Sequence, residues 1–268
     1  MDEVLAIPGF GYGILSPATV RADVPTTLVL LNSGLIHRVG PFRAYVGIGR
    51  YLAGRGVDVF RFDLPRVGDG PAAGVPVDAM VAAVLDVLER ETGTRRIILG
   101  GICSAADIAW RIARDEPRVA GVWLFDGFAQ RGWWFRFARL RRALRRPMRQ
   151  WPRQAWRLLA GLHREGLAQT VDISNIRDWP EPAVFRQQST ELLSRGVRIL
   201  AMYSGGVSKY LMHRRQLDDT FGDSRMHAGL SVAYWPELDH TMMSPADRDR
   251  VMVALGEWCR GFQAAAPA

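Results

Sequence analysis

Apolar and polar positions along the chain follow two different periods. Eight runs are either continuously apolar or alternate in steps of two, which is typical of buried or half-buried strands. They cover residues 4–7, 11–17, 26–34, 57–65, 95–101, 119–127, 197–206 and 230–237. The first two runs lie close together, and we expect them to form a hairpin.

Apolar residues at helical spacing lie between most of these runs. The segments are 42–56, 77–91, 104–114, a helix through Leu217, and 245–262. Strands that alternate with helices predict an α/β fold with a mostly parallel central sheet, covered by helices on both faces. In such folds, ligands bind beyond the carboxyl ends of the strands.

The pattern changes between about residues 127 and 191. Long aromatic and basic runs with helical spacing are broken there by four prolines, at Pro147, Pro152, Pro180 and Pro182. We interpret this segment as a helical cap inserted into a single domain that spans residues 1–268. A chain of 268 residues, of which 48% are hydrophobic, is long enough to bury one sizeable core.

The net charge of +8 is concentrated in the predicted cap, where residues 127–164 include eleven arginines and no acid. One interpretation is a docking face for an acidic acyl carrier protein or for the phosphates of coenzyme A. A second, less favoured, is a basic helix on a membrane surface. A third is a solvated helix whose aromatic residues, Trp133 and Trp134 among them, face the substrate pocket. Nucleic-acid binding is not expected, because no dedicated motif accompanies the arginines.

Two cysteines, Cys103 and Cys259, are too few to predict a disulfide framework and indicate a reducing compartment. The chain has no basic N-terminal region followed by a long apolar core, and no window of about 18 uninterrupted apolar residues. We therefore expect a soluble, cytoplasmic protein. No group of residues has metal-ligand spacing, so neither a metal nor a cofactor is expected.

The stretch "LGGICSAAD", residues 99–107, places a thiol beside a hydroxyl between a predicted strand and a predicted helix. A nucleophile on such a sharp turn needs small residues two positions before and after it. Gly101 and Ala105 flank Cys103 in this way, whereas Ser104 would have the β-branched Ile102 on one side. Cys103 is therefore the better nucleophile. The alternative is that Cys103 is only a small buried apolar residue.

His240 lies between the last predicted strand and the last predicted helix, where α/β-hydrolases place their general base. The acid is less clear from the sequence, because the loop after the penultimate strand has Val207 where a carboxylate is usual. We predict that Asp126, at the end of the strand before the cap, orients His240. Asp218 and Asp219 are the alternatives, and Asp239 is expected to point elsewhere.

Two backbone N–H groups are needed to stabilise an oxyanion. Ser104, directly after the nucleophile, is expected to supply one of them. The loop "NSGLIHRVG" is expected to supply the other through Leu35, with Gly34 permitting the close approach. His37 in this loop either lines the same pocket or holds the loop in place.

Four blocks of the sequence resemble the type 1 group of α/β-hydrolases associated with exosortase systems. They are "HRVGPFRAYVGIGRYLAGRGVDVFRFDLPRVGDG", "GGICSAADIA", "RLRRALRRPMRQWPRQAWRLLAG" and "DHTMMSPADRDRV". The resemblance implies an α/β-hydrolase fold, a cysteine nucleophile at Cys103 and a base at His240. The sequence departs from the group at Val207, where the group has its acid, and in "LFDGFAQ", where an Asn-Pro turn is expected.

A thiolate exchanges readily with thioesters. It reacts poorly with unactivated amides, because the amine is a poor leaving group from the sulfur-bound intermediate. We therefore expect a small-molecule acyl substrate, a thioester or activated ester, and an acyl-enzyme on Cys103. Water would resolve it in a thioesterase or esterase, and an acceptor would resolve it in an acyltransferase or cyclase. We expect the enzyme to act within a biosynthetic pathway. The alternative is a degenerate hydrolase that serves as a binding or accessory protein.

Overall fold

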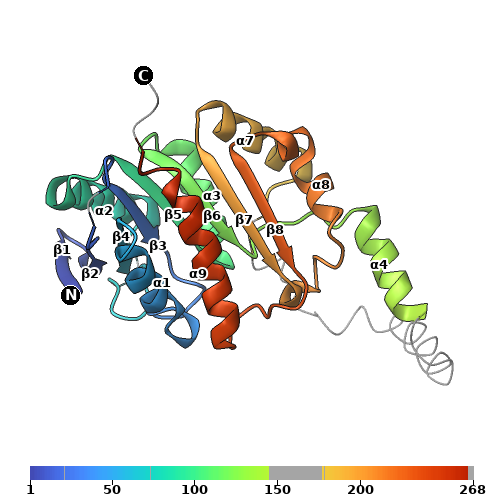
Figure 1. The fold of residues 1–268 in the computed structure, drawn as a ribbon, viewed down its shortest axis with the longest axis horizontal. Coiled ribbons are helices and arrows are strands. Elements are labelled where there is room, and N and C mark those ends of the chain that lie inside the picture. Colours follow the sequence, from blue (N-terminus) through green and yellow to red (C-terminus); the bar gives the residue numbers. More distant parts are fainter. Residues whose placement is uncertain (21, 73, 145–176, 178, 265–268) are drawn as a thin grey trace.

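The computed structural model describes residues 1–20, 22–72, 74–144, 177 and 179–264. Within them, eight strands form one sheet (Figure 1). The strands are β1 (Glu3–Ile7), β2 (Gly11–Ser16), β3 (Thr26–Leu30), β4 (Val57–Phe62), β5 (Arg96–Ile102), β6 (Val119–Phe125), β7 (Arg198–Ser204) and β8 (Leu230–Trp235). Their order across the sheet is β1-β2-β4-β3-β5-β6-β7-β8. The hairpin of β1 and β2 and the pairing of β2 with β4 are antiparallel, and all other pairs are parallel.

The helices lie on both faces of this sheet, as the alternating pattern predicts. They are α1 (Ala44–Ala53), α2 (Val77–Thr92), α3 (Ser104–Asp115), α4 (Trp133–Leu144), α7 (Pro182–Ser194), α8 (Gln216–Phe221) and α9 (Pro245–Arg260), with short 3-10 turns η1 (Pro41–Arg43), η3 (Gly205–Val207) and η4 (Gly222–Met226). No helix among the described residues has the length and apolar character needed to cross a membrane.

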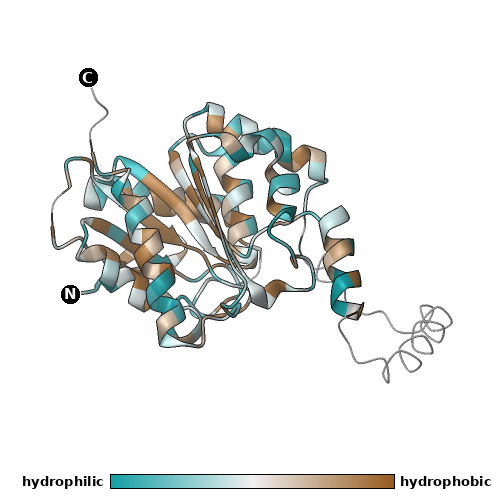
Figure 2. Cartoon of the chain, turned by 45° about the vertical axis from the view of Figure 1, so that its right-hand side comes forward, coloured by the Kyte–Doolittle hydropathy of each residue, from teal (hydrophilic) through white to brown (hydrophobic). Residues whose placement is uncertain are grey.

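Two apolar clusters, one on each face, hold the layers together. Because side chains alternate along a strand, Leu28 and Leu30 of β3 pack with α1 and α9, whereas Val29 and Leu31 pack with α2, α3 and α7. The strands are accordingly apolar through the middle of the molecule, and polar residues lie on the outer surfaces of the helices (Figure 2). The sheet is therefore buried on both sides.

The predicted cap, residues 127–191, is described only in part, since residues 145–176 and 178 lie outside the described residues. Helix α4 falls within it. The first part of α7 does too, yet α7 packs against the sheet: Phe185, Leu192 and Leu193 belong to the same apolar cluster as α2 and α3.

The helix predicted through Leu217 is α8 (Gln216–Phe221), which is short. After β7 the chain forms the short turn η3, and α8 begins only at Gln216. The N–H of Gly205 donates a hydrogen bond to the Leu238 carbonyl at 3.0 Å, which ties this turn to the loop after β8.

Candidate active site

The candidate site lies at the edge where the parallel strands end. Gly34 follows β3, Cys103 follows β5 and Asp126 follows β6, while Ser204 ends β7 and His240 follows β8. Parallel strands bring their carboxyl ends to the same edge of a sheet, so residues far apart in the sequence meet there.

Cys103 occupies a sharp turn between β5 and α3. Its φ of 60° and ψ of −121° lie outside the helical and strand regions, a conformation that residues other than glycine adopt rarely. Space around the turn is limited: a Cβ on Gly101 would lie 2.5 Å from Cβ of Ala105 and 2.7 Å from Oη of Tyr45. The small residues two positions before and after Cys103 are therefore required by the turn.

The side chains of Cys103, His240 and Asp126 form a connected series. Nδ1 of His240 lies 2.7 Å from Oδ2 of Asp126, and the imidazole also shares a hydrogen bond with the Cys103 thiol. Since Nδ1 is hydrogen-bonded to Asp126, Nε2 is the ring nitrogen that remains to interact with the thiol. The structure thus brings together the three residues that the sequence predicts as nucleophile, base and acid.

Asp126 is fully buried, and donors surround its carboxylate. Besides His240 at Oδ2, the backbone N–H of Ser204 donates to Oδ1 at 2.7 Å, and the Ser204 hydroxyl donates to Oδ2 at 2.6 Å. A buried carboxylate is tolerated only when its oxygens are hydrogen-bonded. The end of β7, which in this chain lacks a carboxylate, supplies these donors instead.

The other candidate acids have different partners. Asp218 is exposed and pairs with Arg225 at 3.4 Å. Asp239, next to His240, accepts hydrogen bonds from the N–H groups of Thr241 and Met243, both at 2.7 Å, and so closes the turn before α9. No interaction of Asp219 with His240 occurs among the described residues.

The pKa values of the thiol and the imidazole shift in opposite directions. Burial alone would raise the pKa of Cys103, but the hydrogen bond with His240 and the positive charges of Arg177 and His240 lower it below the ordinary value. Burial alone would lower the pKa of His240, but the hydrogen bonds with Asp126 and Cys103 raise it to about 9. Both directions favour transfer of the thiol proton to the imidazole, which gives a thiolate beside an imidazolium.

The predicted oxyanion loop lies against the start of α3. The N–H of Gly34 donates to the hydroxyl of Ser104 at 2.7 Å, so that N–H is already engaged. The Ser104 N–H points at the Cys103 sulfur, and the Leu35 N–H makes no hydrogen bond within the described part of the chain. The assignment of the Ser104 and Leu35 N–H groups as the two oxyanion donors stays a prediction.

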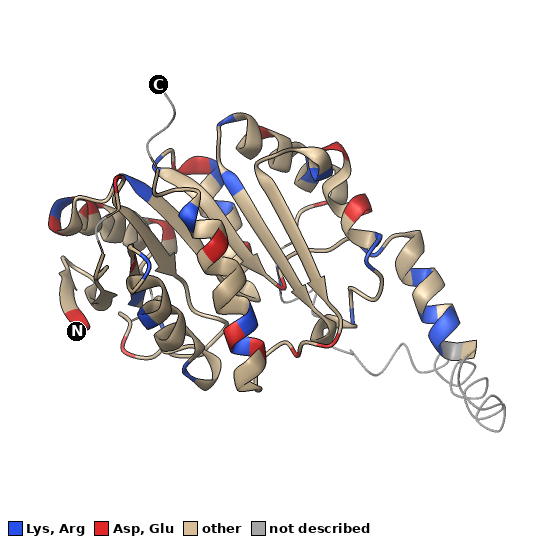
Figure 3. Ribbon diagram, in the orientation of Figure 1, with Lys and Arg blue, Asp and Glu red and all other residues tan. Residues whose placement is uncertain are grey.

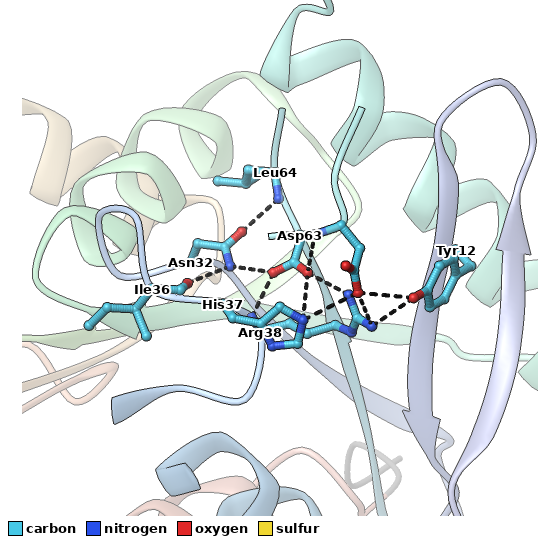
Figure 4. Close-up of polar contacts among 8 residues, drawn as sticks. Tyr12, Asn32, Ile36, His37, Arg38, Asp63 and Leu64 are labelled. Carbon is cyan, nitrogen blue, oxygen red and sulfur yellow. Dashed lines mark hydrogen bonds and ion pairs between the residues drawn. The ribbon is translucent and has the colours of Figure 1, made fainter. Parts of the chain in front are cut away.

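A polar cluster under this loop fixes its path (Figure 4). Oδ1 of Asp63, directly after β4, accepts hydrogen bonds from the Arg38 N–H at 2.6 Å and from Asn32 Nδ2 at 2.9 Å. Oδ2 of Asp63 pairs with the Arg38 guanidinium and, at 3.1 Å, with Nε2 of His37. His37 thus holds the loop, the second of its two predicted roles.

His37, Asp63 and Asp69 are also the one group in the described part of the chain with donor atoms close enough to hold a metal ion, all within 4.8 Å of one another. The guanidinium of Arg38 pairs with both carboxylates, at 2.8 Å in the case of Asp69. A cation would have to displace this guanidinium, so the cluster fits a structural role better than a metal site.

The two predicted pocket tryptophans lie at the start of α4. Trp133 is 70% exposed. Trp134 stacks on His213 with the ring centres 4.9 Å apart. The Arg215 guanidinium also lies over the Trp134 ring, 4.6 Å from the ring centre. Neither contacts the triad in the described part of the chain. A cavity of about 340 Å³ lies beside this stack, bounded by Phe137, Arg141, Arg142, Ser208, His213 and Tyr234.

A larger cavity of about 580 Å³ adjoins the first turns of α3. It begins at Ser104 and is bounded mainly by apolar side chains, including Ile108, Leu124, Phe128, Trp179 and Phe185. Phe128 packs against both Trp179 and Phe185, with ring separations of 5.4 and 4.6 Å. An apolar group beside Ser104 would fit there.

Solved structures that are similar in fold share little sequence with this chain. An esterase from Pyrococcus furiosus is 11% identical, with 98% of this chain and 91% of that chain covered and a TM-score of 0.60. A dienelactone hydrolase from Anabaena variabilis is 12% identical, covering 98% and 99%, with a TM-score of 0.58. A lidless α/β serine hydrolase from Xanthomonas campestris is 14% identical, covering 100% and 96%, at 0.57.

The chain has the α/β-hydrolase fold. No family model matches the sequence, and no curated protein shows detectable sequence similarity to it. Within an α/β-hydrolase fold, the turn at Cys103 corresponds in position to the strand-to-helix turn that carries the nucleophile.

Two residues of the site were not predicted from the sequence. In the sequence, Ser204 is only a serine at the end of a predicted strand. Its role becomes visible when β7 lies beside β6 and brings it to Asp126. Arg177 belongs to the basic, proline-interrupted stretch interpreted as the cap, yet its guanidinium is buried against Cys103 and Asp126. No local sequence signal distinguishes it from the other arginines there.

Proposed function

We propose that the protein is an acyl-transfer enzyme that forms an acyl-enzyme on Cys103 from a thioester or activated ester. The observation that carries the proposal is the connected series of Cys103, His240 and Asp126, with the thiol on a strained turn at the end of β5. The resemblance of the elbow and histidine blocks to the exosortase-associated hydrolases supports the same assignment.

The first step follows from the charges. The Cys103 thiolate attacks the acyl carbon and forms a carbon–sulfur bond, and the N–H groups of Ser104 and Leu35 stabilise the oxyanion. The bond to the leaving thiolate or alkoxide then breaks, and the imidazolium of His240 donates a proton to it. Asp126 holds Nδ1 of the ring throughout, so that Nε2 is the nitrogen that transfers the proton.

The second step depends on the state of His240. Once the sulfur is acylated, its negative charge no longer raises the pKa of the imidazole, so the ring releases its proton more easily. Neutral His240 then takes a proton from water or from an amine, alcohol or carbon acceptor. That nucleophile attacks the acyl carbon, and Cys103 leaves as a thiolate.

The surroundings suggest which donors fit. The apolar cavity next to Ser104 favours an acyl group with an apolar chain or ring. Helix α4 carries Arg136, Arg139, Arg141 and Arg142 and no acid (Figure 3), and two of these line the smaller cavity with His213. This basic surface favours a donor whose acyl group is attached to a phosphate-bearing carrier, either coenzyme A or an acyl carrier protein.

Turnover of synthetic thioesters tests the proposal. Wild type should release free thiol from a series of acyl thioesters, faster for apolar chains than for acetyl, and intact-mass measurement should detect the acyl group on Cys103. Cys103→Ser should lose most of this turnover, while Cys259→Ala serves as the matched control. Equal thiol release by wild type and Cys103→Ser would reject the proposal, and no release by either would favour a binding protein.

A further inference from the structure

Arg177 is a buried arginine whose hydrogen bonds are fully used. Its side chain is 4% exposed. Nε and one Nη2 proton bind the two carboxylate oxygens of Asp107, the Nη2 contact being 2.7 Å. The other Nη2 proton goes to the Cys103 carbonyl at 3.0 Å, and Nη1 donates to the Asp126 carbonyl at 3.1 Å and to Oη of Tyr210 at 3.3 Å.

A guanidinium has five N–H donors, and these five contacts occupy them all. None is left for a substrate. Arg177 is therefore not placed to bind a carboxylate or phosphate group of a ligand, although it lies beside the candidate nucleophile. Its contacts with Asp107, Trp179 and Tyr210 hold the guanidinium in one orientation.

Two of the acceptors are the backbone carbonyls of the candidate nucleophile and of the candidate acid. Both residues have positive φ, 60° at Cys103 and 54° at Asp126, so each backbone is held in a conformation that is costly outside glycine. The arginine is 74 residues from Cys103 and 51 from Asp126 in the sequence. One side chain thus bridges the ends of β5 and β6 where these two strained turns lie.

We propose that Arg177 is a positioning residue, which fixes the turns of Cys103 and Asp126 relative to each other and keeps a permanent positive charge beside the thiolate. This inference rests on the proposed function, because it assigns Arg177 a part in the same thiol chemistry. Tyr210 supports the bridge, since its hydroxyl donates to the Asp126 carbonyl at 2.8 Å while it accepts from Arg177.

Other ionisable groups face the thiol or its partners from several elements, and the charge of Arg177 acts among them. They are His240 from the loop after β8, Asp126 after β6, Asp107 on α3, Tyr45 on α1 and Tyr210 after η3. Asp107 pairs with the guanidinium directly, so loss of Arg177 alone would leave a largely buried carboxylate unpaired.

Two variants separate position from charge. Arg177→Lys keeps a positive charge, but a single ammonium group cannot reach both carbonyls and the carboxylate. Arg177→Gln combined with Asp107→Asn removes the charge without leaving a buried carboxylate unpaired. The matched control is Arg118→Lys, because Arg118 also binds several carboxylates, those of Asp86, Glu89 and Glu116, but precedes β6 at the opposite edge of the sheet.

The readout is the pH dependence of Cys103 alkylation by iodoacetamide, measured on the full chain together with the melting temperature. The double variant should raise the midpoint of the profile by at most about 1 pH unit, the low end of the effect of a nearby opposite charge, because the opposing charge of Asp107 is removed with that of Arg177. Arg177→Lys should move the midpoint less, but should lower kcat for an acyl thioester about tenfold or more with little change in KM, as misplacement of the reacting groups does. Arg118→Lys should change neither.

An ordinary thiol profile in the wild type would overturn both the proposed function and this inference. A wild-type profile below the ordinary thiol range, combined with unchanged midpoints and unchanged kcat in both Arg177 variants, would overturn the inference alone. A lower melting temperature with no change in either readout would give Arg177 a purely structural role and would also contradict the inference.

Discussion

The carboxylate of Asp126 lies 2.7 Å from Nδ1 of His240, although the two residues are 114 positions apart. The contact forms at the carboxyl ends of β6 and β8, two strands separated in the sheet by β7. The carboxylate comes from the end of β6, whereas the end of β7 offers the donors of Ser204 and the following turn η3 has Val207. The proposed acid and base therefore follow strands that are not neighbours.

Replacement of this acid gives the first prediction. Asp126→Asn should lower kcat by about 10⁴, the loss known for an amide that holds a catalytic histidine in the wrong tautomer. Steady-state turnover of an acyl thioester measures it, with Asp218→Asn and Asp219→Asn as controls that should retain activity. A large loss confined to either control would reassign the acid.

Ser204 gives the second prediction. Ser204→Ala removes one hydrogen bond to a buried carboxylate, and hydrogen bonds to charged groups contribute about 1.5–3 kcal/mol, so kcat should fall about tenfold or more. Ser189→Ala is the matched control: this serine is equally buried, but its hydroxyl donates to the Phe185 carbonyl within α7 at 2.7 Å. Unchanged turnover in Ser204→Ala would show that the remaining donors suffice to hold Asp126.

The sequence predicts most of the frame of this site and less of its interior. Cys103 is recognisable because Gly101 and Ala105 mark a turn too tight for larger residues, and His240 because of its place between strand and helix. The fold class and the alternation of strands and helices along the chain follow from the local periods of apolar residues. These signals lie in short stretches of sequence, so they can be recognised without knowledge of tertiary contacts.

Ser204 and Arg177 could not be found in this way, because their roles depend on which carbonyl or carboxylate lies opposite them after folding. The same limit applies to the turn between β7 and the helix through Leu217: its hydrogen bond to the loop after β8 joins segments that are distant in the sequence. The extent of the cap stays a prediction, since most of it lies outside the described residues.

The basic surface of α4 gives the third prediction. Arg142→Glu should raise KM for an acyl-coenzyme A about tenfold at low salt, because reversing a charge weakens attraction of an anionic donor. KM for an uncharged thioester such as acyl-N-acetylcysteamine should not change. Arg260→Glu, at an exposed residue at the end of α9, is the control for net charge. An acylated carrier protein as a third donor identifies the carrier, because the donor whose KM rises most in Arg142→Glu is the one that binds this surface. KM values equal in wild type and variant for all three donors would exclude a role of this surface in donor binding.

The charges at the site give the fourth prediction, a bell-shaped dependence of thioester turnover on pH. On the acidic side, turnover is lost when the thiolate becomes protonated. The lowered pKa of Cys103 therefore places the acidic limb below the ordinary thiol range. The pKa of His240, raised to about 9, places the alkaline limb near that pH, because a neutral imidazole can no longer protonate the leaving group. An alkaline limb near pH 6.5 would show that the imidazole is not paired as described.

The central claim is that Cys103 is an ionised nucleophile at neutral pH, and competitive alkylation within one molecule tests it most directly. Cys259 is the internal reference, because its thiol is fully buried and burial raises its pKa to about 12. Limiting iodoacetamide at pH 7, followed by peptide mass analysis, should label Cys103 rapidly and leave Cys259 unmodified. Slow labelling of Cys103, at a rate no greater than that of Cys259, would contradict the account.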